Sequence, residues 1–245
     1  MLRPDGPPNV MPALAPQHMM EPYSDSLGDS ALTELSAFDR RFLSRSAKRG
    51  LDVAVAGVAL ALLLPLMLLV AAAVWAGDRQ SPIFRHSRLG RGGRTFGCLK
   101  FRSMVTNGEA VLAAHLAADP AARREWEETH KLTHDPRVTP LGRILRKTSL
   151  DELPQLINVL RGEMSLVGPR PIVQAEVARY GSAFPACFAV PPGVTGLWQV
   201  SGRSDTTYAE RVALDLDYAS RWSLTRDIAI LVRTVPAVFA QRGSR

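Results

Sequence analysis

One segment restricts the possible folds of this chain more than any other. Residues 53–76 read VAVAGVALALLLPLMLLVAAAVWA and contain no charged side chain. About 20 apolar residues are enough for a helix to cross the hydrocarbon core of a bilayer. The segment starts too far along the chain for a signal peptide, and a basic cluster rather than a cleavage site adjoins it. The sequence therefore predicts a membrane helix, with a buried helix of a soluble protein as the weaker alternative.

The flanks of this segment and its central proline predict the path of the helix. The flanking cations are Arg40, Arg41, Arg45, Lys48 and Arg49 before it, and Arg79, Arg85, Arg88, Arg91, Arg94, Lys100 and Arg102 after it. Because Lys and Arg mark the cytoplasmic side of a membrane, a spanning helix would violate that rule at one end. Pro65 removes a backbone donor and clashes with the preceding turn. We therefore expect a re-entrant helix, broken at Pro65, with a kinked spanning helix as the alternative.

The charge balance indicates which partners the chain can bind. Its 245 residues carry 30 Lys and Arg against 23 Asp and Glu, a formal net charge of +7. Such an excess favours acidic lipid surfaces, phosphorylated substrates or nucleic acid. Nucleic acid is not expected, because the basic residues flank an apolar segment and no binding motif is present. Cys98 and Cys187 fit no metal-binding spacing, so we expect reduced thiols.

The whole chain predicts an α+β fold dominated by helices. Residues 1–37 form a proline-rich tail that we expect to be disordered. Residues 38–79 hold the basic flank and the membrane helix, and residues 80–245 form the domain that follows it, which we expect on the cytoplasmic side. Residues 81–104 alternate polar and apolar side chains around three glycines, which predicts a small β-hairpin. Helices are expected at 108–118, 120–132, 141–147, from 151 to about 161, at 207–220 and from 223, the last of them amphipathic, interrupted by Pro236 and interfacial.

Two adjacent carboxylates, Asp151 and Glu152, admit two interpretations. Ser149 and Glu152 fit a capping box, in which Asp151 would only complement the helix dipole. Yet the sequence near the carboxylates is unusually cationic, with Arg143, Arg146, Lys147, Arg161 and Arg170. An ionised Asp can attack phosphorus to form an acyl phosphate, with Mg²⁺ and cationic side chains offsetting the repulsion between anions. The residues alone are compatible with both interpretations, phosphoryl transfer beside a membrane and a simple helix cap.

Four motifs carry a family resemblance. They are KRGLDV, KFRSM, DPRVTPLGRILRKTSLDELPQLINVLRGEMSLVGPRP and PPGVTGLWQVSGR, which begin at residues 48, 100, 135 and 191. Together they resemble the bacterial sugar transferases called monotopic phosphoglycosyl transferases, over residues 48–243. The resemblance implies transfer of a sugar 1-phosphate from a UDP-sugar to undecaprenyl phosphate with release of UMP. This is the first membrane step of exopolysaccharide synthesis, and the likeness is to members that transfer galactose 1-phosphate.

The same resemblance implies roles for individual residues. Asp151 would be the nucleophile, Glu152 would complete the dyad, and both would hold Mg²⁺. The expected phosphate and nucleotide contacts are Lys100, Arg102, Arg146, Lys147 and Arg170. Residues 53–76 correspond to the family's re-entrant helix, although Leu64 stands before Pro65 where many members have a small polar residue. These roles imply a monotopic enzyme of the inner membrane whose catalytic domain faces the cytoplasm.

Two other functions remain compatible with the composition. A non-catalytic, membrane-anchored basic scaffold would not release UMP, and a membrane phosphatase or hydrolase would need no lipid acceptor. The sequence fixes neither the sugar nor the oligomeric state, and a homo-oligomer stays open.

Overall fold

The computed structural model describes residues 25–129, 132–202 and 206–239. Its contacts divide the chain into two compact units, Met1–Leu43 and Ser44–Arg245. The first helix, α1 (Asp25–Asp78), begins in the first unit and continues into the second. Residues 25–37 are therefore helical, whereas the sequence analysis placed them in a disordered tail. The reason is local: the prolines of the tail end at Pro22, and helix-forming residues follow.

Within the second unit, α1 is apolar but mostly uncovered. Ser44–Asp78 is the one helix in the described ranges that is long and apolar enough to cross a membrane, and most of its apolar stretch is not buried by the rest of the unit. Its exposed large apolar side chains are Val53, Val55, Val58, Leu62, Leu64, Leu66, Leu68, Leu69 and Trp75. A core helix of a soluble protein would bury these side chains, so the soluble alternative does not fit.

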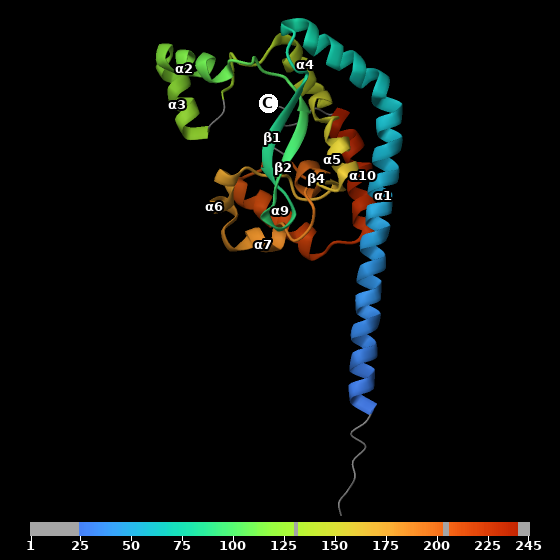
Figure 1. The fold of residues 1–245 in the computed structure, drawn as a ribbon. Helices are drawn as coiled ribbons and strands as arrows, with labels where there is room; N and C mark the ends of the chain where they lie inside the picture. The colour runs from blue at the N-terminus through green and yellow to red at the C-terminus, as the bar shows by residue number, and fades with distance from the viewer. Residues whose placement is uncertain (1–24, 130–131, 203–205, 240–245) are drawn as a thin grey trace, which may run out of the picture. The chain divides into compact units, whose positions relative to one another are not determined.

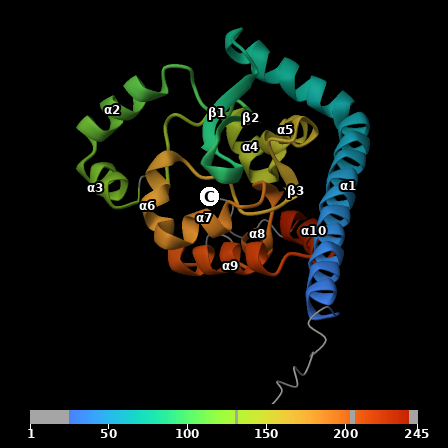
Figure 2. The same ribbon diagram turned by 60° about the horizontal axis from the view of Figure 1, so that its bottom comes forward.

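The helix bends, but it does not break, at its proline. The helical conformation of α1 continues through Pro65. Both ribbon views nevertheless show a pronounced bend in the C-terminal part of α1 (Figures 1 and 2). A proline inside a helix removes one hydrogen bond and pushes against the preceding turn, which kinks the axis while the neighbouring hydrogen bonds persist. The predicted break at Pro65 is thus a bend.

Both halves of this segment pack against the rest of the second unit. Ala56, before the bend, belongs to an apolar cluster with Val159 and Ile230. After the bend, Met67, Val70 and Val74 form another cluster with Phe101 and Leu145. Their spacing of three and four residues puts them on one face of the helix. One side of the bent helix is therefore fixed to the domain, and its other side presents apolar side chains outward.

Two short sheets lie within the unit. The predicted hairpin is present: β1 (Ile83–Leu89) pairs antiparallel with β2 (Thr95–Phe101). In the turn between them Gly92 and Gly93 have φ values of 65° and 74°, a left-handed backbone that glycine adopts without strain. The sequence analysis did not predict the second sheet, in which β3 (Ser165–Val167) pairs parallel with β4 (Gly193–Thr195).

Helices form the rest of the unit. They are α2 (Gly108–Ala118), α3 (Pro120–Thr129), α4 (Pro140–Thr148), α5 (Gln155–Arg161), α6 (Val177–Tyr180), α7 (Phe184–Cys187), α8 (Leu197–Val200), α9 (Tyr208–Ser220) and α10 (Leu224–Phe239). The helix predicted at 207–220 is present as α9, and a capping box of Thr207 and Glu210 opens it. The last helix, α10, continues through Pro236 instead of being interrupted there. It lies beside α1 in both views (Figures 1 and 2).

Candidate active site

The hairpin presents one polar face toward the candidate site. In an antiparallel pair, residues directly opposite each other point to the same side, and the side alternates along each strand. His86 lies opposite Cys98, and Phe84 lies opposite Lys100. Arg88, two residues beyond His86, therefore shares that face. The Arg88 guanidinium donates to the carbonyl of Pro171 at 3.3 Å, so this face also contacts the chain that follows β3.

The adjacent carboxylates lie in a turn between two helices. The Thr139 hydroxyl accepts from the Gly142 N–H at 2.9 Å and caps α4, and Ser149 ends that helix in a left-handed conformation with φ 58°. A 3-10 turn (Leu150–Glu152) follows, and α5 begins at Gln155. The Ser149 side chain makes no capping hydrogen bond, so the capping-box interpretation is wrong. The left-handed backbone at Ser149 takes the place of the extended N-cap geometry that a capping box needs.

Glu152 is paired with cations instead of with the backbone. Its Oε1 accepts from the Lys100 ammonium at 2.6 Å and lies 4.0 Å from Nη2 of Arg170. The same ammonium is 4.0 Å from Oδ2 of Asp151. Arg146 donates from Nε to the Ser103 hydroxyl at 2.9 Å. One lysine thus serves two carboxylates, with further positive charge close by.

Burial makes Asp151 a weaker acid than an exposed aspartate. Only 7% of the residue is exposed. This burial raises the pKa of Asp151 to about 6, against the opposing effect of the Lys100 charge; Glu152 raises it further and Arg146 lowers it. The sequence analysis considered only the helix terminus and the cations, which favour the ionised form, and so missed the larger effect of burial. At pH 7 the ionised form still predominates by about ten to one.

A small cavity adjoins Glu152. Its polar lining combines three cations with one carboxylate and one amide: Arg88, Lys100, Arg170, Glu152 and Gln155. Cys98, Pro171, Gly193 and Val194 complete the lining. The enclosed space, about 10 Å³, has room for about one water molecule, so the support for an anionic ligand comes from the three cations around it. Guanidinium and ammonium groups match phosphate oxygens well.

Comparison with known proteins identifies the family. The family model described as bacterial sugar transferase matches residues 43–241. The chain belongs to the bacterial sugar transferase family. It is 52% identical over 197 residues to the exopolysaccharide production protein ExoY of Sinorhizobium fredii, covering 80% of this chain and 87% of that protein.

Two further relatives are similar over a comparable length of this chain. The UDP-galactose-lipid carrier transferase of Erwinia amylovora is 52% identical over 201 residues. The undecaprenyl-phosphate galactose phosphotransferase of Salmonella typhimurium is 50% identical over 201 residues. Each match covers 82% of this chain and 42% of the relative.

The structure of this sugar transferase brings together some of the expected cations and places others elsewhere. Lys100 and Arg170 lie at the carboxylates, and Arg146 is near enough to lower the pKa of Asp151. Arg102 instead forms an ion pair with Asp78 at the end of α1, with Nη2 2.6 Å from Oδ1. Lys147 is exposed in the last turn of α4. Arg102 therefore fixes α1, and phosphate contacts by Arg102 and Lys147 stay predictions.

Two polar residues of the sugar transferase cavity escaped the sequence analysis. Arg88 was counted only among the basic flank, and Gln155 was not singled out. The alternation of side chains along the strands could have identified Arg88, because Arg88 and Lys100 lie on the same face of the hairpin. Gln155 has a weaker signal, its position three residues after Glu152 at the start of α5.

The donor set of this sugar transferase fits Mg²⁺ bound together with a phosphorylated substrate. Within residues 25–129, 132–202 and 206–239, no group of three or more His, Cys, Asp or Glu side chains is arranged to hold a metal. Mg²⁺ commonly binds through one or two carboxylates plus waters and substrate phosphates, and it does not require a cage of protein ligands. Asp151 and Glu152 supply such a pair.

Proposed function

We propose that this sugar transferase moves a sugar 1-phosphate from a UDP-sugar to undecaprenyl phosphate, and that the sugar is galactose. One observation carries the proposal most: Asp151 and Glu152 share the Lys100 ammonium beside a cation-lined cavity, in a domain that holds an exposed apolar helix. The relatives named above include a UDP-galactose-lipid carrier transferase and an undecaprenyl-phosphate galactose phosphotransferase. The release of UMP would make the reaction measurable.

Two displacements at one phosphorus account for the reaction. In the first, an Asp151 carboxylate oxygen attacks the sugar-bearing phosphorus of the UDP-sugar. The bond from that phosphorus to the bridging oxygen breaks, and UMP leaves with the electron pair. In the second, a phosphate oxygen of undecaprenyl phosphate attacks the same phosphorus. The aspartyl bond then breaks, the carboxylate is restored, and a lipid-linked diphosphate sugar forms.

The surrounding residues would bind and orient the donor. Lys100 and Arg170 are placed to neutralise diphosphate charge, and Arg146 helps to keep Asp151 ionised. Glu152 holds Lys100 beside Asp151, and the two carboxylates would hold Mg²⁺. The ion would supply charge neutralisation for the diphosphate. Because burial raises the pKa of Asp151, cationic partners are needed to keep the nucleophile in its reactive form.

The contacts on both sides of the apolar segment of α1 support a monotopic, re-entrant arrangement. Lys48 and Asp52 bond to the chain around β3 before the apolar segment, and Asp78 pairs with Arg102 after it. A straight helix of this length would separate those ends by about 45 Å at 1.5 Å per residue. One folded domain that holds both ends requires them on the same side of a bilayer. The charge rule makes that side the cytoplasmic one.

UMP release from the full-length chain tests the reaction. Purified protein in lipid nanodiscs receives UDP-galactose and Mg²⁺, with and without undecaprenyl phosphate. We expect sustained UMP release only with the acceptor and a single burst without it. Sustained release of free galactose 1-phosphate without acceptor would show a hydrolase instead. No release under either condition, from folded protein and across a panel of UDP-sugars, would leave a non-catalytic scaffold.

Cysteine labelling tests the topology. Cysteines placed singly at Ser46 and Gly92, in a background without Cys98 and Cys187, should both be shielded from an impermeant reagent in intact cells. Labelling of one position and not the other would establish a spanning helix.

The donor sugar has its own test. A site that hydrogen-bonds one hydroxyl configuration rejects the other epimer, because a buried polar group is then left unpaired. UDP-galactose should therefore be used in preference to UDP-glucose. Equal use of both, or a preference for UDP-glucose, would refute the choice of sugar and leave the reaction class intact.

A further inference from the structure

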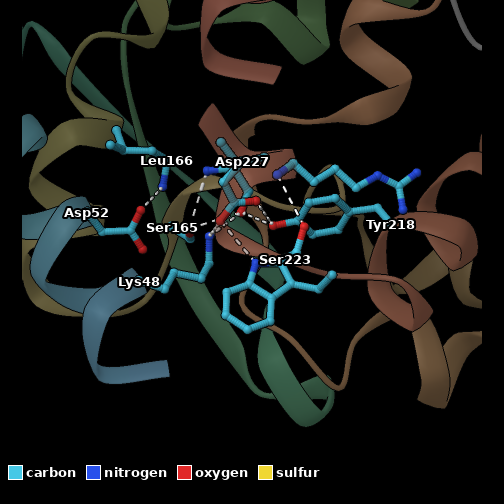
Figure 3. Close-up of polar contacts among 10 residues, drawn as sticks. Lys48, Asp52, Ser165, Leu166, Tyr218, Ser223 and Asp227 are labelled. Atoms are coloured by element: carbon cyan, nitrogen blue, oxygen red, sulfur yellow. Dashed lines mark hydrogen bonds and ion pairs between the residues drawn. The ribbon is translucent and has the colours of Figure 1, made fainter. Parts of the chain in front are cut away.

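A buried ion pair fixes the start of the apolar helix to α10. The Lys48 ammonium lies 2.6 Å from Oδ2 of Asp227, and the Asp227 residue is only 1% exposed (Figure 3). Asp227 also accepts from the Tyr218 hydroxyl at 2.8 Å and from Nε1 of Trp222 at 3.0 Å. Each oxygen of the buried carboxylate therefore has a donor, as a buried charge requires.

Lys48 makes a second bond that points toward the candidate active site. Its ammonium donates to the carbonyl of Val167 at 3.1 Å, and the Ser165 hydroxyl is a second donor to this oxygen, at 3.0 Å. The Tyr218 hydroxyl oxygen lies 2.9 Å from the same carbonyl oxygen, but its single proton is donated to Asp227. Val167 is the last residue of β3. A single carbonyl at the end of this strand thus accepts hydrogen bonds from α1 and from its own strand, and Tyr218 of α9 packs against it.

The chain that leaves Val167 leads directly to the candidate active site. Gly168 donates from its N–H to the Thr195 carbonyl at 2.9 Å, and a Cβ at this position would lie 2.4 Å from the carbonyl oxygen of Pro191. Only glycine, which has no side chain, allows the backbone to approach so closely here. At the far end of residues 168–171 the Pro171 carbonyl accepts from Arg88. The backbone on both sides of Arg170 is therefore fixed.

Arg170 is the side chain that this turn presents. Its guanidinium is 4.0 Å from Glu152 and 5.8 Å from the centroid of the Trp198 ring. About a third of the side chain is exposed, so its own contacts hold it less firmly than those that fix the backbone beneath it. The position of the guanidinium therefore depends strongly on how the turn is held at Val167.

We propose that Lys48 is a positioning residue for Arg170, acting through the Val167 carbonyl. The inference rests on the proposed function, because it assigns Arg170 to binding the donor diphosphate. The lysine at the base of the membrane helix then has two roles: it fixes α1 to the domain, and it orients the turn that carries a donor-binding cation. Loss of the first role changes stability, whereas loss of the second changes donor affinity.

Steady-state kinetics of full-length variants in nanodiscs separate the two roles. Lys48→Met should raise KM for the UDP-sugar about tenfold, the scale of one hydrogen bond to a charged group, with kcat and KM for undecaprenyl phosphate little changed. Arg49→Met is the matched control. Arg49 lies next to Lys48 on α1 and also fixes it, through the carbonyls of Val159 and Leu160, but it makes no bond to β3. Its donor KM should stay near that of the wild type.

Two double variants keep the test independent of folding. Lys48→Met with Asp227→Asn leaves no unpaired buried charge, so stability should recover while the raised donor KM persists. In an Arg170→Ala background, Lys48→Met should raise the donor KM no further, because the residue it positions is gone. A donor KM that recovers together with stability, or additive effects of Lys48→Met and Arg170→Ala, would overturn the inference. Wild-type protein that releases no UMP would instead refute the proposed function.

Discussion

Two lysine–carboxylate pairs of equal length occupy different environments in this molecule. Lys48 lies 2.6 Å from Asp227, and Lys100 lies 2.6 Å from Glu152. Around Asp227, a tyrosine hydroxyl and an indole N–H complete the hydrogen bonding of the carboxylate. Lys100, in contrast, is shared between Glu152 and the buried Asp151, from which it is 4.0 Å away.

The difference between the pairs separates structure from reactivity. A buried charge that is fully hydrogen-bonded stabilises one arrangement, and removing one partner leaves the other uncompensated. A buried carboxylate whose cation is distant and shared keeps part of its charge uncompensated. It is therefore stabilised by a further positive partner or by a reaction that removes the charge. The raised pKa of Asp151 is the measurable sign of this incomplete compensation. We therefore expect substitutions at the first pair to change stability and those at the second to change chemistry.

The largest effect should come from Asp151→Asn. Asparagine keeps the shape of the side chain but removes the anionic oxygen that attacks phosphorus. Transfer should fall by about three orders of magnitude or more with the fold intact. Wild-type protein given UDP-galactose and Mg²⁺ without acceptor should carry a phosphosugar adduct that peptide mass spectrometry places on Asp151.

Glu152→Gln is the control for this assignment. It should also slow turnover, but any trapped adduct should still lie on Asp151. Near-normal transfer by Asp151→Asn, or an adduct on Glu152, would show that the nucleophile is wrongly assigned.

The second prediction compares the stability of two lysine substitutions. Lys48→Met should lower the free energy of unfolding by about 3–5 kcal/mol, because it leaves Asp227 buried without its cation. Lys100→Met removes the same group from a pair that is less deeply buried, with side-chain exposures of 21% and 24%, and should cost less, about 1.5–3 kcal/mol. Thermal or denaturant unfolding in detergent measures both. Equal losses would mean that the two pairs do not differ as the geometry indicates.

Much of this contrast lay beyond the sequence. Local patterns predicted the hairpin and the apolar helix, because turn glycines and long apolar runs act over a few residues. The Lys48–Asp227 pair joins positions 179 residues apart, and no local pattern reports such a contact. The bend at Pro65 was predicted as a break, because local rules give the missing hydrogen bond but not the packing of Met67, Val70 and Val74 after it.

The residues of the candidate site could be predicted where sequence motifs contain them. Properties of those residues that depend on burial could not. The adjacent carboxylates and the cations of the KFRSM and GPRP motifs directed attention to Asp151, Glu152, Lys100 and Arg170, which the structure brings together. Spacing alone could not show that Arg102 is engaged by Asp78. Nor could it show that burial outweighs nearby charge at Asp151, because burial is a property of the whole fold.

A third prediction concerns the chemical role of Lys100. Its ammonium serves both carboxylates and lines the cavity. Lys100→Met should lower kcat about a hundredfold, the scale found when one electrostatic stabiliser is removed from an active site. Lys147→Met, which neutralises an exposed cation of α4, is the comparison. A similar loss from both would point to general electrostatic attraction of the donor instead of a specific role.

The smallest effect should be a displacement of the pH profile. Attack requires ionised Asp151, and burial raises its pKa to about 6. Mg²⁺ held by the two carboxylates would lower the same pKa, so the acid limb of the UMP burst should lie below pH 6 at saturating Mg²⁺ and move toward pH 6 as the Mg²⁺ concentration is lowered. The Lys100 charge lowers this pKa and the Glu152 charge raises it. The acid limb should thus move to higher pH in Lys100→Met and to lower pH in Glu152→Gln. Rapid-quench measurement of the burst in both variants decides the matter, since a limb that stays in place would mean that a group other than Asp151 titrates.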